Sequence, residues 1–122
     1  PVIENVDKLG FAALTKECKK ISKVAREGKL KPNQLKGSTF TLSNLGMFDV
    51  DSMTPIINQP ELAILATGKI KEKPVVVKGS IEVRSMMTMN LSIDHRIIDG
   101  APAAAFLTDL KKILENPTLL LV

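Results

Sequence analysis

The stretch that most constrains this chain is MNLSIDHRIIDG, residues Met89–Gly100. It begins as a strand, because apolar Leu91 and Ile93 alternate with polar residues. It then ends in a cluster of ionisable side chains closed by a glycine: Asp94, His95, Arg96, Asp99 and Gly100. Burying charge is costly unless the charge is paired, so this cluster needs a structural or a chemical reason. His95 is the only histidine and a natural general base, although a lone histidine at a strand end is more often structural.

The first third of the chain contains the pattern of an amphipathic helix. Four residues recur at helical spacing and form its apolar stripe: Leu14, Cys18, Ile21 and Ala25. We expect the helix to begin near Lys8 with Asp7 as its cap, and to end at Gly28. We expect Cys18, on the apolar stripe, to be a small buried residue and not a nucleophile.

The remaining elements are mostly strands, followed by a second helix. Strands are expected at residues 39–43, 61–70, 74–78 and 80–92, with a turn at Lys78 and Gly79. Pro74 suits the start of its strand, and the apolar run from Leu62 to Ala66 predicts burial on both faces. Residues 100–116 form the second helix, with Pro102 in its first turn. Two helices and several strands of this kind predict an α+β fold with helices packed on a mixed sheet.

Composition narrows the classes of function. The chain has 122 residues, 44% of them hydrophobic and 25% charged, which suits a single globular domain. The net charge of +4 comes with no tryptophan or tyrosine, so a solvated helix face explains the lysines better than nucleic-acid binding. No apolar run is long enough for a membrane span. The single cysteine allows no disulfide and indicates a reducing compartment, while one histidine and one cysteine are too few for a typical metal site.

A second motif gives the cluster a chemical meaning. Residues Gly37–Phe48 read GSTFTLSNLGMF, and DHRIIDG follows about fifty residues later. In this order, and with PIINQPELAILATG and RSMMTMNLS between them, the motifs resemble the catalytic domain of the dihydrolipoamide acyltransferases. These proteins are the core components of 2-oxo acid dehydrogenase complexes. The resemblance covers residues 1–122 and corresponds to the C-terminal half of that domain.

The resemblance implies a fold, a reaction and three site residues. The fold is the two-layer sandwich of chloramphenicol acetyltransferase, a more distant relative, and the reaction transfers an acyl group between dihydrolipoamide and coenzyme A. His95 corresponds to the general base, Ser43 to the serine that stabilises the oxyanion, and Asp99 to an aspartate that holds the site by ion pairing. In the distant relative the partner of this aspartate is an arginine from the N-terminal half. We interpret Asp94 and Arg96 as structural, and no serine lies in the GxSxG motif of a hydrolase.

The resemblance also implies partners. The family forms homotrimers that assemble into a larger core, with the lipoyl group carried on a separate domain. It works with a 2-oxo acid decarboxylase and dihydrolipoamide dehydrogenase, in the bacterial or archaeal cytoplasm or the mitochondrial matrix, without metal, membrane or nucleic acid. Two alternatives stay open: an oligomeric scaffold fragment without turnover, and an acetyltransferase of the antibiotic-modifying type.

Overall fold

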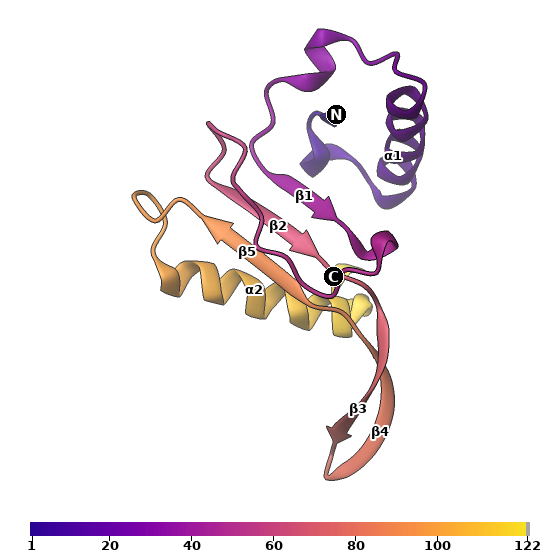
Figure 1. The fold of residues 1–122 in the computed structure, drawn as a ribbon, viewed down its shortest axis with the longest axis vertical. Helices are drawn as coiled ribbons and strands as arrows, with labels where there is room; N and C mark the ends of the chain where they lie inside the picture. Colours follow the sequence, from indigo (N-terminus) through magenta and orange to yellow (C-terminus); the bar gives the residue numbers. More distant parts are fainter. Residues whose placement is uncertain (122) are drawn as a thin grey trace. The chain divides into compact units, whose positions relative to one another are not determined.

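The computed structural model describes residues 1–121 (Figure 1). The chain divides into two compact units, Pro1–Thr39 and a second unit that begins at Phe40. Each unit is described by itself. All three residues singled out for chemistry, Ser43, His95 and Asp99, belong to the second unit.

The first unit contains helix α1, Phe11–Arg26, between two 3-10 turns, Val6–Lys8 and Pro32–Leu35. The predicted cap at Asp7 is wrong: the residue lies inside the first 3-10 turn, and Gly10 is the N-cap of α1. The left-handed backbone of Asn5, φ 52°, starts that separate turn, so the chain reaches the helix later than expected. The predicted end is confirmed, since Gly28 adopts φ 66° just beyond the helix and the Lys29 amide donates to the Val24 carbonyl.

The apolar stripe of α1 is only partly covered within the chain. Leu14, Ile21 and Ala25, expected to be buried, are only half-buried, and no residue of α1 is fully buried. Cys18 is exposed, however, so its predicted burial is wrong. Helical spacing places Cys18 near the stripe, but spacing does not determine which neighbour covers each position.

The second unit is organised around a three-stranded sheet of β1 (Thr41–Asn44), β2 (Ala63–Thr67) and β5 (Met89–Ile93). Strand β2 lies in the middle, parallel to β1 and antiparallel to β5, so the sheet is mixed as predicted. Residues 63–66 are the buried core of the chain, at most 8% exposed. Leu62, at the start of the predicted buried run, is 40% exposed because it precedes the strand.

Strands β3 (Lys71–Val77) and β4 (Ser80–Met86) pair only with each other, in a separate antiparallel hairpin that extends from the sheet (Figure 1). The predicted turn is confirmed: Lys78 and Gly79 both have positive φ, as a tight hairpin turn requires. Two details of the prediction are wrong. Pro74 lies in the middle of β3, which is tolerated because an edge strand does not need every N–H. The predicted strand 80–92 is two strands, interrupted at Met87 and Thr88, where the Gly68 amide donates to the Thr88 carbonyl.

Helix α2, Gly100–Glu115, follows β5 and packs against it, and a 3-10 turn, Pro117–Leu121, follows the helix. Its observed bounds agree with the prediction, and Pro102 lies in the first turn. The rings of Phe40 and Phe106 lie 6.2 Å apart and join the start of the second unit to the helix. The fold is therefore α+β, with a helix on a mixed sheet, as predicted from the sequence.

A close backbone crossing fixes the loop between β1 and β2 against the sheet. A Cβ atom at Gly68 would lie 1.9 Å from the Asp51 carbonyl oxygen, and one at Gly46 would lie 2.7 Å from the Gly68 carbonyl oxygen. The Lys69 amide donates to the Val50 carbonyl beside this crossing. The loop that follows Ser43 can therefore lie this close to the sheet only because Gly46 and Gly68 have no side chain.

We predict that Gly68→Ala destabilises the protein by about 1–3 kcal/mol or more, the usual range for forcing atoms into a packed site. Gly100→Ala is the matched control, because nothing lies within 4 Å of a Cβ there and Gly100 is the first residue of α2, where alanine is a good helix former. Urea unfolding followed by circular dichroism measures both variants. Equal midpoints for the two variants would contradict the proposed crossing.

Candidate functional site

His95 lies in the turn that joins β5 to α2. Three main-chain hydrogen bonds form this turn: the Asp94 amide donates to the Leu62 carbonyl at 2.8 Å, and the Asp94 carbonyl accepts from Ile97 at 3.0 Å and Ile98 at 2.9 Å. The side chain of His95 is exposed, and within residues 1–121 its imidazole makes no hydrogen bond. The ring is therefore free to exchange a proton with a bound molecule.

The residues on either side of His95 form a close ion pair. Arg96 Nη2 lies 2.6 Å from Asp94 Oδ2, and Arg96 Nε lies 2.9 Å from Asp94 Oδ1. The Arg96 amide also donates to Asp94 Oδ1 at 3.1 Å. The hydrogen bonds from the Arg96 side chain, and then that from its amide, lower the pKa of Asp94 to about 2. The same carboxylate raises the pKa of Arg96. Both groups are thus charged throughout the neutral range.

Asp99 is the N-cap residue of α2, with extended backbone at φ −77° and ψ 160°. Its side chain makes no capping hydrogen bond. It is exposed, and within residues 1–121 it forms no ion pair. Its carboxylate is therefore available to a partner outside the described chain, and it lies in the same turn as His95.

Ser43 is half-buried near the end of β1, beside Ala66 of β2. The next residue, Asn44, accepts a hydrogen bond from the Gly46 amide at 2.8 Å, so its side chain makes the turn that ends the strand. At the start of β1, the Thr41 hydroxyl donates to Glu61 Oε2 at 2.6 Å, and Asn58 donates to Glu61 Oε1 at 3.0 Å. Glu61 is only 4% exposed and anchors β1 to the loop before β2.

The strand register places Ser43 and His95 at opposite ends of the sheet. Ser43 lies beside Ala66, and Ala66 lies beside Asn90 on β5. His95 lies two residues beyond the end of β5, and the three strand steps from Asn90 to Ile93 alone span roughly 10 Å at about 3.3 Å per residue. His95 and Asp99 therefore both lie in the short connection between β5 and α2, whereas Ser43 lies towards the other end of the sheet.

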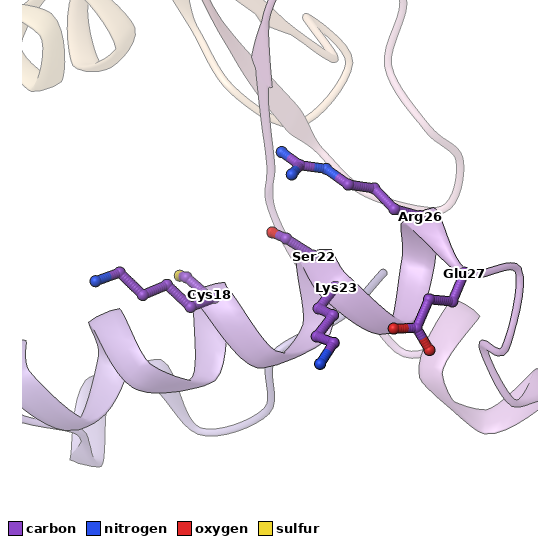
Figure 2. Close-up of a pocket in the computed structure, with 6 residues that line it drawn as sticks. Cys18, Ser22, Lys23, Arg26 and Glu27 are labelled. Carbon is purple, nitrogen blue, oxygen red and sulfur yellow. The ribbon is translucent and has the colours of Figure 1, made fainter.

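An open hollow lies along α1, in the first unit, and contains none of the three predicted site residues. Figure 2 shows its lining, and its volume is about 470 Å³. The lining residues are Cys18, Lys19, Ser22, Lys23, Arg26 and Glu27. Within residues 1–121, no group of three or more histidine, cysteine, aspartate or glutamate side chains is arranged to hold a metal ion. No helix in the described part of the chain has the length and apolarity needed to cross a membrane.

Comparison with known proteins identifies the family. The model of the 2-oxoacid dehydrogenase acyltransferase catalytic domain matches residues 1–122. The chain belongs to this family. It is 47% identical over 122 residues to the dihydrolipoyllysine-residue succinyltransferase component of the 2-oxoglutarate dehydrogenase complex of Rickettsia felis. The matched region covers all of this chain and 30% of that protein.

Two solved structures of the family have the same fold. They are a dihydrolipoamide acetyltransferase from Azotobacter vinelandii and the cubic core of a pyruvate dehydrogenase multienzyme complex. Each is 38% identical with a TM-score of 0.94, over all of this chain and 50% of the solved chain. The chain thus spans half the length of these solved relatives and less than a third of the succinyltransferase.

Sequence reasoning missed two features around the predicted site residues. The fork between Asp94 and Arg96 joins residues two positions apart in a turn, where no helix or strand periodicity predicts which side chains face each other. The buried carboxylate of Glu61 was read only as the first residue of a strand. Its position after Pro60 and before an apolar run was the one available sign that it is enclosed.

We predict that Arg96→Gln raises the pKa of Asp94 from about 2 towards its ordinary 3.8, because the Arg96 side chain is the main cause of the shift. Since the pKa of Asp94 is lowered on folding, the pair stabilises the fold above about pH 4, and this contribution is lost as the pH falls towards 2. Carbon-13 NMR titration of the Asp94 carboxyl measures the midpoint. An unchanged midpoint in Arg96→Gln would show that another group lowers this pKa.

Proposed function

We propose that residues 1–122 are the C-terminal half of the catalytic domain of an acyltransferase that moves an acyl group between dihydrolipoamide and coenzyme A. Membership of the acyltransferase family supports this reaction class. The chain's relative in Rickettsia felis acts on a dihydrolipoyllysine residue, as its name states. A catalytic domain of about twice this length agrees with the solved relatives.

In the proposed reaction the neutral imidazole of His95 takes the proton of the coenzyme A thiol. A thiol has a pKa of about 8.5 and a histidine one of about 6.5, so this transfer has a modest cost. The thiolate attacks the carbonyl carbon of the S-acyl dihydrolipoamide and forms a tetrahedral oxyanion. When this intermediate collapses, the carbon–sulfur bond to dihydrolipoamide breaks, and the departing thiolate recovers the proton from the imidazolium.

The other two site residues serve the intermediate and the geometry. The Ser43 hydroxyl donates a hydrogen bond to the oxyanion, where a preorganised donor has its largest effect. Asp99 holds the turn of His95 through an ion pair with a cation outside the described chain. Its free carboxylate, exposed beside the base, is the observation that supports this role.

The spacing of the three residues supports their assignment. In the Azotobacter vinelandii enzyme, the residues examined for roles in catalysis are a serine, a histidine 52 positions later and an asparagine four positions after that. Ser43, His95 and Asp99 have the same spacing here. This chain has an aspartate where that enzyme has an asparagine, so the residue at this position differs in its charge.

The observation that carries the proposal is the separation of Ser43 and His95 by the strand register. Since the two lie at opposite ends of one sheet, we propose that each site combines His95 of one subunit with Ser43 of its neighbour. In a closed ring, each subunit places His95 at the interface with one neighbour and Ser43 at the interface with the other, so all interfaces are identical. A homotrimer is such a ring.

The β3–β4 hairpin supports contact between subunits. Its cross-strand pairs Pro74–Val83 and Val76–Ile81 share one face, and three of these side chains are 67–77% exposed: Val76, Ile81 and Val83. An isolated two-stranded hairpin is marginally stable in water, so an apolar face of this kind needs a cover. We propose that trimers assemble into the core of a complex, with a lipoyl domain, a 2-oxo acid decarboxylase and dihydrolipoamide dehydrogenase as partners, in the bacterial cytoplasm or mitochondrial matrix.

We predict that His95→Ala in the complete domain lowers turnover by at least about 100-fold, and that Ser43→Ala lowers it by roughly 10²–10³-fold. Mixed at equal ratio and refolded together, the two inactive variants should recover about a quarter of the wild-type sites, because each site needs one intact residue from each of two subunits. Mass spectrometry checks that mixed trimers form. No recovery in verified mixed trimers would place the site within one chain.

A scaffold without turnover is the second candidate, and the unpaired Asp99 favours it for the isolated chain. We predict that residues 1–122 alone transfer acyl groups to coenzyme A at a very low rate, because the partner of Asp99 is missing. Separation of acyl-coenzyme A from coenzyme A by liquid chromatography measures the rate, and sedimentation measures assembly. Robust turnover by the isolated chain would contradict this prediction, whereas assembly without turnover would support the scaffold.

A further inference from the structure

We propose that Asp94 and Arg96 form a latch that positions His95, so that both are positioning residues for acyl transfer. This inference rests on the proposed role of His95 as the base. In this proposal neither residue contacts the substrate. Each acts by fixing the main chain that carries the His95 imidazole.

The latch holds the chain on both sides of His95. Before the histidine, the Asp94 amide donates to the Leu62 carbonyl at 2.8 Å, which extends the pairing of β5 with β2. After it, the Arg96 amide donates to Asp94 Oδ1 at 3.1 Å. With the peptide groups on either side fixed, the backbone angles of His95 are fixed, and so is the direction of its Cα–Cβ bond.

The guanidinium keeps the carboxylate in the orientation that this geometry needs. Arg96 Nε lies 2.9 Å from Oδ1 and 3.2 Å from Oδ2 of Asp94, and Nη2 lies 2.6 Å from Oδ2. A planar fork on both oxygens fixes the plane of the carboxylate, which a lysine does not do. The Asp94 side chain is 17% exposed while that of Arg96 is 79% exposed, so the guanidinium lies on the solvent side of the carboxylate.

Two observations favour positioning over a purely structural role. An ion pair this exposed contributes little to global stability. The imidazole has no hydrogen bond within residues 1–121, so the direction in which it points depends on the turn beneath it. Small displacements of a catalytic group reduce turnover strongly, even when they leave the fold intact.

A different role for Arg96 makes a different kinetic prediction. An exposed guanidinium is also suited to binding a phosphate of coenzyme A. Such a contact predicts a higher KM for coenzyme A at unchanged kcat, and it gives Asp94→Ala a smaller effect than Arg96→Gln. The latch predicts the reverse: a lower kcat with KM nearly unchanged, and similar effects from both sides of the pair.

The test uses steady-state kinetics of the complete catalytic domain with Arg96→Gln, Asp94→Ala, Asp94→Asn and the double variant Asp94→Ala/Arg96→Gln. We expect Arg96→Gln and Asp94→Ala each to lower kcat roughly 10- to 100-fold, with KM for coenzyme A within about twofold. The double variant should lose no more than Asp94→Ala alone, because the two residues act as one unit. Asp94→Asn should recover part of the loss, since an amide oxygen still accepts from the Arg96 amide.

Arg84→Gln is the matched control. Arg84 makes the same kind of pair with Glu82, two residues before it on β4, with Nη2 at 2.6 Å and Nε at 3.0 Å from Oε2. Its loss should leave kcat unchanged. The surface variant Arg96→Gln keeps the test decisive if Asp94→Ala fails to fold.

The outcomes separate the latch from the proposed function. Wild-type kcat in Arg96→Gln, with His95→Ala inactive, overturns the latch and leaves the base in place. A raised KM at unchanged kcat also overturns it and makes Arg96 a ligand contact. Additive losses in the double variant show that the two residues do not act together. Full activity of His95→Ala overturns the proposed function itself.

Discussion

The pairing of β2 with both its neighbours is the interaction on which the second unit depends. Its residues 63–66 form the buried hydrophobic core of the described part of the chain. These four consecutive residues are buried on both faces of the sheet, so the register is set by the backbone pairing of β2 with β1 on one side and with β5 on the other. The same register fixes Ser43 and His95 at opposite ends of the sheet. Burial of four small or branched side chains therefore sets the distance between the two proposed halves of the chemistry.

Much of the fold follows from local signals. The second helix was predicted within one residue because a glycine, a proline in the first turn and a following proline mark its ends. The hairpin turn was predicted because Lys78 and Gly79 separate two strand patterns. The first helix was misplaced because a left-handed residue and a 3-10 turn precede it, and neither changes hydrophobic periodicity. Exposure of Cys18 was missed for a related reason: periodicity defines a face, but the covering of that face is a tertiary property.

The candidate site likewise has one part that local sequence predicts and one part that depends on tertiary structure. Ser43, His95 and Asp99 were identified through motifs, which are local. Their separation into two groups comes from strand order and register, which no motif contains. The hydrogen bonds from the Arg96 guanidinium to the Asp94 carboxylate depend on how the chain turns after β5. Local sequence therefore names the proposed reacting groups, while the arrangement of the strands that carry them arises from pairing over long sequence distances.

The hairpin has a consequence for the proposed association between copies of this chain. A two-stranded ribbon has two free edges, and free edges invite pairing with any exposed strand. Pro74 removes one donor from the β3 edge, and the lysine and arginine of the Lys73–Arg84 pair place like charges on the polar face. Edge-to-edge addition is thereby disfavoured while the apolar face stays available. In the proposed assembly, this arrangement favours selective association over sheet growth without limit.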